Sequence, residues 1–201
     1  MTGTEFTALL ILATAMSFTP GPNTTLSTAM AANHGLKRAM PFVCAVPVGW
    51  GLLLGACALG LGALVLALPW LGWAVKAVGV GYLLWLASRL ARTRAMVQTS
   101  AVTVGFGPGV ALQFVNIKAW MLALTIVSGW VAGHDDAPAR FAVVLPVMLF
   151  YAFTSNLAYA LVGSLLRAWL AGPNGSHARL MWFNRLMAGV LVLTGVWMLR
   201  L

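Results

Sequence analysis

Long apolar blocks place the strongest constraint on this chain. Residues 43–68 contain no charged side chain, and residues 139–166 contain only Arg140. Both blocks exceed the ~20 residues with which a helix crosses a bilayer. Of the 201 residues, 61% are hydrophobic and 7% charged, which leaves too little polar surface to cover the core of a soluble domain. The sequence therefore predicts an all-α integral membrane protein with one transmembrane domain over residues 1–201.

The apolar blocks predict six transmembrane helices, and the charges between them predict their direction. The spans are 5–34, 40–67, 70–88, 106–132, 138–166 and 180–200. The first, third and fifth connections hold Lys37, Arg38, Arg89, Arg92, Arg94, Arg167 and Arg179. The opposite side holds Arg140, Arg200, Glu5, Asp135 and Asp136. We expect the protein to lie in the inner membrane of the cell. Because cytoplasmic connections are rich in Lys and Arg, we expect both termini to lie on the non-cytoplasmic side. The net charge of +9 then reflects topology and not nucleic-acid binding.

The first predicted span is interrupted near its middle by Pro20-Gly21-Pro22-Asn23. Proline lacks a backbone donor, and it also pushes the residue before it out of helical geometry. The backbone groups freed at membrane depth must face protein or a water-filled cavity, because lipid offers no hydrogen-bond partner. Thr24 follows at once and suits the start of a second half-helix. We therefore expect a broken helix at this position.

The fourth predicted span carries a partial counterpart of the first. It begins Phe106-Gly107-Pro108-Gly109 and then places Gln113, Asn116 and Lys118 inside an apolar helix. The chain thus divides into two three-helix units, about 1–92 and about 104–201. Because three is odd, the two units must run in opposite directions through the membrane. In such inverted repeats, paired broken helices mark the binding site.

Three motifs together resemble the lysine-exporter (LysE) superfamily of amino-acid efflux proteins. They are Pro20-Gly21-Pro22-Asn23 followed by Asn33-His34-Gly35-Leu36-Lys37-Arg38, then Lys76-x-x-Gly79-x-x-Tyr82-Leu83-x-Trp85-Leu86, and Gln113-Phe114-Val115-Asn116-Ile117-Lys118-Ala119. The resemblance implies a proton-driven exporter. Ile117 stands where the superfamily usually has proline, so we expect the fourth helix to be less sharply broken than the first. An aliphatic residue there is similar to the cysteine and O-acetylserine exporter subgroup, which implies a small neutral amino acid as substrate.

The candidate site residues are the polar and helix-breaking groups inside the spans. Half-helix N-termini and asparagine side chains can bind a substrate carboxylate, and an intramembrane lysine is by default a functional group. In the fifth span, Tyr151, Ser155, Asn156 and Tyr159 recur at helical spacing and predict a polar stripe. The predicted substrate-binding residues are Pro20, Gly21, Pro22, Asn23, Thr24, Gln113, Asn116, Lys118, Asn156 and Tyr159.

Absent features narrow the function further. No acid lies within a span unless Glu5 dips inward, which argues against a dibasic substrate. His134-Asp135-Asp136 is interpreted as a solvated turn, so we expect neither a metal nor another cofactor. The chain lacks Gly-x-Ser-x-Gly and His-Glu-x-x-His, which argues against an enzyme.

The leading hypothesis is a secondary transporter that exports small neutral amino acids by alternating access. The alternatives are an exporter of basic or branched-chain amino acids, a passive channel and an accessory membrane subunit. The expected partners are the amino acid and the lipid bilayer. Gly49-x-Gly51-x-x-x-Gly55 also permits close helix packing, within the chain or in a homodimer.

Overall fold

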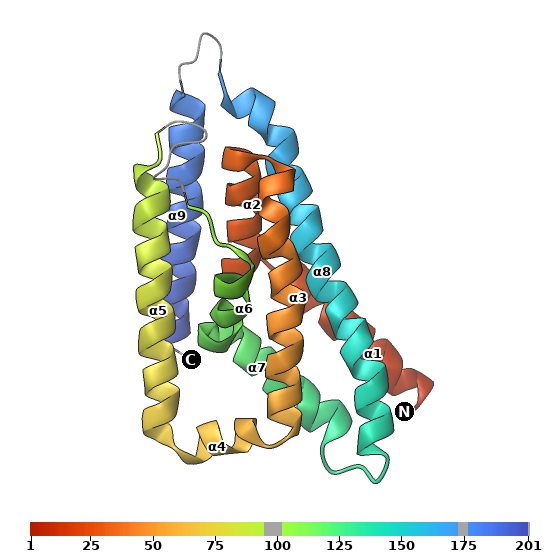
Figure 1. Ribbon diagram of the computed structural model, residues 1–201. Coiled ribbons are helices and arrows are strands. Elements are labelled where there is room, and N and C mark those ends of the chain that lie inside the picture. Colours follow the sequence, from red (N-terminus) through yellow and green to blue (C-terminus); the bar gives the residue numbers. More distant parts are fainter. Residues whose placement is uncertain (95–101, 173–176, 201) are drawn as a thin grey trace.

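The computed structural model describes residues 1–94, 102–172 and 177–200, and these are helical apart from short connections (Figure 1). The helices are α1 (Gly3–Phe18), α2 (Pro22–His34), α3 (Leu36–Ala58), α4 (Leu61–Ala67), α5 (Pro69–Arg92), α6 (Phe106–Val115), α7 (Ile117–Ile126), α8 (Ala137–Leu170) and α9 (Ala178–Leu199). A π-helical turn, Val127–Val131, continues α7. The all-α prediction is confirmed for the part of the chain that the structure describes.

Fewer than six helices of the structure are long and apolar enough to qualify as membrane spans. Four helices, α3, α5, α8 and α9, are long and apolar enough to cross a membrane. Helix α6, with α7 and its π-helical turn, forms a fifth candidate span that bends by 68°. The predicted first span, 5–34, is instead divided between α1 and α2, of 16 and 13 residues. Each is too short to cross a membrane alone.

The second predicted span, 40–67, extends further than the helix that the structure shows. Helix α3 stops at Ala58, and Gly60 follows with φ of 100°, a left-handed conformation that favours glycine. The chain then turns into the short helix α4, which crosses to α5 at one end of the molecule in Figure 1. The apolar run continues through this corner, so hydropathy alone could not detect it.

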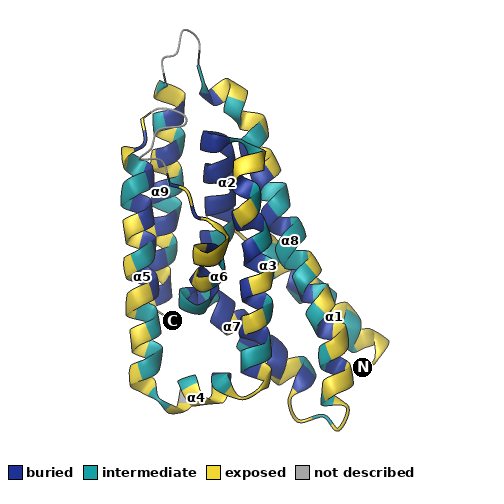
Figure 2. Ribbon diagram, viewed as in Figure 1, coloured by how far each residue is buried: buried dark blue, intermediate teal, exposed yellow. Residues whose placement is uncertain are grey.

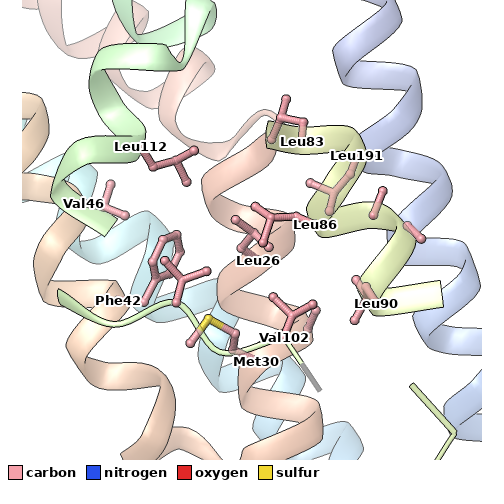
Figure 3. Packing of buried hydrophobic residues seen from close by; sticks show 14 of the residues in the cluster. Leu26, Met30, Phe42, Val46, Leu83, Leu86, Leu90, Val102, Leu112 and Leu191 are labelled. Carbon is pink, nitrogen blue, oxygen red and sulfur yellow. The ribbon is translucent and has the colours of Figure 1, made fainter. Parts of the chain in front are cut away.

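Helix α2 lies at the centre of the bundle. It packs along α8 and against α3 and α9, and every residue of it except Asn23 is buried (Figure 2). Figure 3 shows Leu26 and Met30 of α2 among Phe42 of α3 and Leu86 of α5. A second apolar cluster joins α1, α3, α7 and α8 around Trp50 and Ile126. Apolar packing therefore holds a helix of rather polar sequence inside the protein.

The outer helices present apolar side chains away from the core. Trp70, Trp182, Leu165 and Leu193 are each at least 66% exposed. Exposed apolar surface of this extent is expected of a protein surrounded by lipid. Several tryptophans on these faces lie beside cations, as in the stacking of Arg185 on Trp182 at 5.5 Å from guanidinium to ring centre.

Charge is sorted between the two ends of the molecule. The end of α2 with the start of α3, the end of α5, and the end of α8 with the start of α9 lie at one end in Figure 1, and the N-terminus, α4 and the α7–α8 connection lie at the other. The seven basic residues of the predicted cytoplasmic connections lie at or near the first set of helix ends, so we call this the basic end. The sorting along the sequence is thus also a sorting in space.

The opposite end holds an ion cluster that joins α1 to α8. Arg140 of α8 donates to Asp136 at 2.7 Å and to Glu5 of α1 at 3.2 Å. The Arg140 hydrogen bond lowers the pKa of Asp136 from its ordinary value. All three acids of the chain lie at this end, and His134-Asp135-Asp136 belongs to the exposed α7–α8 turn, with no metal-binding cluster among the residues described.

The glycines that suggested a dimer face pack within the chain. A Cβ at Gly49 would lie 2.6 Å from the Val110 carbonyl oxygen of α6, and one at Gly51 would lie 2.8 Å from Leu149 of α8. These positions therefore bring α3 close to its own neighbours, and they no longer argue for contact with a second copy.

We predict that Gly163→Ala destabilises the protein by about 1–3 kcal/mol, because overpacking a tight contact forces the backbone to shift. Gly163 of α8 lies against the backbone carbonyl of Thr28 in α2, with no room for a Cβ. The control is Gly189→Ala in α9, where a Cβ has open space and alanine favours the helix. Thermal unfolding in detergent should separate the two variants, and equal melting temperatures would contradict the prediction.

Candidate functional site

The first helix break lies between α1 and α2, as the prolines predicted. Gly21 is the N-cap of α2, and its N–H donates to the Thr24 hydroxyl at 3.0 Å. The Thr24 hydroxyl in turn donates to the Gly21 carbonyl at 3.2 Å. Tyr159 of α8 donates to the Phe18 carbonyl at 2.8 Å, so a carbonyl at the end of α1 also has a partner. Side chains thus take over the hydrogen bonds that the broken helix cannot make.

The second break lies at Asn116, between α6 and α7. Asn116 has extended backbone angles, and the chain bends by 68° although Ile117 replaces the usual proline. Two contacts explain how it forms without proline. The backbone of α5 at Gly79 lies directly against the Val115 carbonyl, and the Trp120 indole donates to the Phe114 carbonyl at 2.8 Å. The fourth helix is therefore broken at this position even without a proline.

A cavity of about 70 Å³ lies between the two breaks. It is large enough for a handful of water-sized groups. Its polar lining includes Ser17, Thr19, Gly21, Asn23, Thr24, Asn116, Lys118, Ser155 and Asn156. Its apolar lining includes Met16, Pro22, Val46, Trp50, Leu122 and Met148. The lining comes from the end of α1, the first turn of α2, the middle of α3 and α8, and the start of α7.

Lys118 connects the two breaks. Its Nζ donates to the Thr19 carbonyl at 2.9 Å, and its alkyl chain lies over Gly21, where a Cβ would be 3.3 Å away. Helix α1 ends at Phe18, just before Thr19, and the partial negative charge of a helix C-terminus favours a cation there. The chain's three acids lie at the opposite end, so a carbonyl rather than a carboxylate faces this ammonium.

Asn116 supplies an unused acceptor at the cavity. The side chain is 4% exposed, and its Oδ1 has no hydrogen-bond partner among the residues described. Burying a polar atom without a partner costs free energy, typically about 1–3 kcal/mol. Asn116 lines the cavity, so a small movement of its side chain would present this buried acceptor to a ligand that carries N–H or O–H groups.

Two polar pairs fix α2 beside the cavity. Asn23 donates to Gln113 at 2.7 Å and accepts from it at 3.2 Å, and Ser27 donates to Asn156 at 2.9 Å. Gln113 is fully buried in α6, and Asn156 is 3% exposed in α8. These bonds cross from the first predicted unit to the second.

The structure thus brings most of the predicted site residues together. Gly21, Pro22, Asn23, Thr24, Asn116, Lys118 and Asn156 line the cavity. Gln113 and Tyr159 lie behind it and support Asn23 and the end of α1. Pro20 is exposed at the break and does not line the cavity. That any of these residues binds substrate remains a prediction.

The sequence interpretation missed part of the cavity wall on α8, namely Met148 and Ala152. Met148, Ala152, Ser155 and Asn156 follow one another on one face of α8 and together form the cavity side of that helix. Their spacing was visible, but the predicted stripe began at Tyr151, which instead accepts from Thr14 of α1 at 3.0 Å. Ser17 and Thr19 could have been found from their position just before Pro20.

A helical membrane protein whose two broken helices enclose a polar cavity has the architecture of a membrane transporter. The sequence profile of the LysE type translocator family matches residues 14–201 of the chain. The chain belongs to this family, and it is therefore a translocator and not an enzyme.

Curated relatives agree with this assignment. The chain is 31% identical to a cysteine/O-acetylserine efflux protein of Klebsiella pneumoniae over 83% of its own length and 86% of the relative's. It is 27% identical to the protein of the same name from Escherichia coli K12, over the same shares of the two chains. The Salmonella typhimurium protein of that name is 28% identical over 75% of this chain and 78% of the relative. No solved structure matches the chain.

We predict that Ser27 and Asn156 stabilise the fold as a pair. In a double-mutant cycle, Ser27→Ala and Asn156→Ala should show a coupling free energy of about 0.5–1.5 kcal/mol, as interhelical hydrogen bonds in membranes do. Unfolding in detergent measures the four free energies. The control cycle pairs Ser27→Ala with Thr194→Ala, a residue of α9 that bonds to its own helix, and should give additive changes. Additivity in the first cycle would show that the pair contributes nothing jointly.

Proposed function

We propose that the protein exports small neutral amino acids or their derivatives, such as cysteine, O-acetylserine or homoserine, from the cytoplasm across the inner membrane. The observation that carries this proposal is the cavity between the two breaks, whose lining includes Lys118 and Asn116 and no acid. The curated relatives are named cysteine/O-acetylserine efflux proteins, which supports this choice of substrate.

The chemistry of the cavity suits a zwitterion. Its carboxylate would bind Lys118 and the N-termini of α2 and α7, which carry partial positive charge. Its ammonium would donate to Asn116 Oδ1, which has no partner among the described residues, and to the Thr19 carbonyl. A second ammonium, as in a dibasic amino acid, would find no carboxylate, because the lining residues include no acid.

The size and the apolar wall support a short side chain. A cavity of about 70 Å³ favours a small ligand. Met148 and Leu122 give the side chain an apolar surface to contact. If export uses proton exchange, Lys118 is the titratable side chain on the cavity wall that would take up and release the proton.

We further propose that α1 with α2 forms a sixth span, which gives two inverted three-helix units. The contacts between helices are consistent with such a repeat, because the main contacts between the units have counterparts when the two units are exchanged. The first broken helix packs on α8 as the second packs on α3, while α3 contacts α8 and α5 contacts α9. With the basic end in the cytoplasm, both termini would lie outside.

The proposed transport cycle begins from a state closed at the basic end. There, Asn33 of α2 and Asn184 of α9 exchange hydrogen bonds of 2.8 and 3.0 Å, and Asn184 also donates to the Thr93 carbonyl at 3.3 Å. All three residues are at most 1% exposed. Substrate from the cytoplasm could reach the cavity only after this network opens, so the Asn33–Asn184 pair would act as the cytoplasmic gate.

The transport proposal is tested by counterflow of labelled cysteine and O-acetylserine into proteoliposomes. Uptake should saturate and should be competed by the unlabelled compounds and by homoserine, but not by lysine. Flux that does not saturate would indicate a channel. No flux across a broad amino-acid panel would overturn the proposal.

We predict that Lys118→Met and Asn116→Ala each reduce substrate affinity about 10-fold or more, because each removes a hydrogen bond to a charged group of the substrate. Lys76→Met is the matched control, since Lys76 lies on α5 against Trp73 and away from the cavity. The substrate affinity of the Lys76→Met variant should be unchanged. Equal transport by Lys118→Met and Lys76→Met would contradict the site.

We predict that a covalent bridge across the gate stops transport. The variant carries Asn33→Cys and Asn184→Cys with Cys44 and Cys57 replaced, and it is treated with a short bis-methanethiosulfonate. Counterflow should fall at least 10-fold and return after reduction. Each single-cysteine variant, treated in the same way, should keep transporting. Full counterflow after confirmed bridging would show that this network need not open.

A further inference from the structure

Unsatisfied nitrogen atoms gather at the basic end, away from the cavity. His34 Nε2 and Arg167 Nε are both buried without a hydrogen-bond partner among the residues described. His34 ends α2 and is 8% exposed, and Arg167 lies near the end of α8. Buried polar atoms of a protein are rarely left without a hydrogen bond, so these two nitrogen atoms call for an explanation.

The two residues meet at a corner formed by Gly35. Gly35 has φ of 85°, which favours glycine, and this conformation turns the chain directly from α2 into α3. The Arg167 guanidinium lies against this corner, with Nη1 3.7 Å from the position of a Cβ on Gly35. Arg167 therefore sits beside the residue that follows His34.

Two further groups at this corner attract negative charge. Helix α3 starts at Leu36, and the first-turn N–H groups of a helix have no partner within it. Arg38 extends from the same turn, and both Arg38 and Arg167 act electrostatically on His34. The other nitrogen of the imidazole is engaged with the Val102 backbone, which fixes the ring and leaves Nε2 as the unpaired atom.

No carboxylate of the protein lies at this corner. The chain has three acids in total, and Glu5, Asp135 and Asp136 all lie at the other end. Arg167, His34 and the N-terminus of α3 therefore meet beside the exposed Arg38 without a carboxylate. Arginine pairs preferentially with the planar oxygens of carboxylates and phosphates, and basic groups at the membrane surface bind phosphate head groups.

We propose that the His34–Gly35 corner is an anion site that binds a phosphate group through Arg38, Arg167 and the N-terminus of α3, while His34 Nε2 accepts a hydrogen bond from a hydroxyl of the phosphate or of its head group. It is separate from the cavity of the proposed transport function and does not depend on it. The phosphate belongs either to an anionic phospholipid or to a soluble phosphate, and the two sources share the same chemistry. A bound phosphate would join α8 to the α2–α3 corner.

The test uses the full chain, purified in a neutral detergent. Binding of phosphatidylglycerol and of phosphatidylcholine is measured by native mass spectrometry, and binding of inorganic phosphate is measured by thermal unfolding. The variants are Arg167→Gln, Arg38→Gln and His34→Gln. Arg92→Gln is the matched control, because Arg92 is an exposed arginine at the same end on α5.

We expect phosphatidylglycerol to bind at least 10-fold more tightly than phosphatidylcholine, and Arg167→Gln and Arg38→Gln to weaken it about 10-fold. Arg92→Gln should change it less than 2-fold. If inorganic phosphate instead raises the melting temperature of the unmodified protein but not of Arg167→Gln, the ligand is a soluble phosphate. Arg38 is exposed on the surface, so Arg38→Gln tests the site even if Arg167→Gln fails to fold. Equal effects of Arg38→Gln and Arg92→Gln on both ligands would overturn the proposal.

Discussion

The whole structure depends on burying a polar helix. Helix α2 contains Asn, Thr and Ser at many positions, yet only Asn23 of its residues escapes full burial. Its own threonines bond within the helix, as Thr28 does to the Thr24 carbonyl at 2.8 Å. The remaining side chains need partners elsewhere, because a polar group in an apolar bundle is costly without a hydrogen bond. The arrangement of the surrounding helices follows from where those partners are.

Three residues of α2 each bond to a different helix of the second half of the chain. Asn23 pairs with Gln113 of α6, Ser27 with Asn156 of α8, and Asn33 with Asn184 of α9. These three pairs hold α2 against the second half of the chain, and in the proposed transport cycle the third pair also closes the basic end. Rigid packing and function therefore rest on one set of contacts, and any movement of α2 exchanges hydrogen bonds at several helices together.

The sequence predicted the helical membrane fold, the first break and most of the polar lining of the cavity, because these depend on local chemistry. Pro20 and Pro22 prevent a continuous helix wherever they occur. The second break is different, because Gly79 and Trp120 that accompany it lie on α5 and α7, and their contacts arise only when the helices pack. Gly60 likewise ends α3 within an apolar run that hydropathy treats as one span. Gln113 and Tyr159 were recognised as polar, but whether a polar residue lines a cavity or supports its wall is decided by neighbours distant in the chain.

Helix α8 is longer than a bilayer is thick. Its 34 residues extend for about 51 Å at 1.5 Å per residue, whereas the hydrocarbon core measures about 30 Å. Tilting, visible in Figure 1, takes up part of the excess, and the remainder must project into the head-group layer. Arg167 lies near one end of this helix, while Arg140 holds the other end to α1. The length of this one helix ties the protein to membranes of a particular thickness, and a thinner bilayer would have to deform around it.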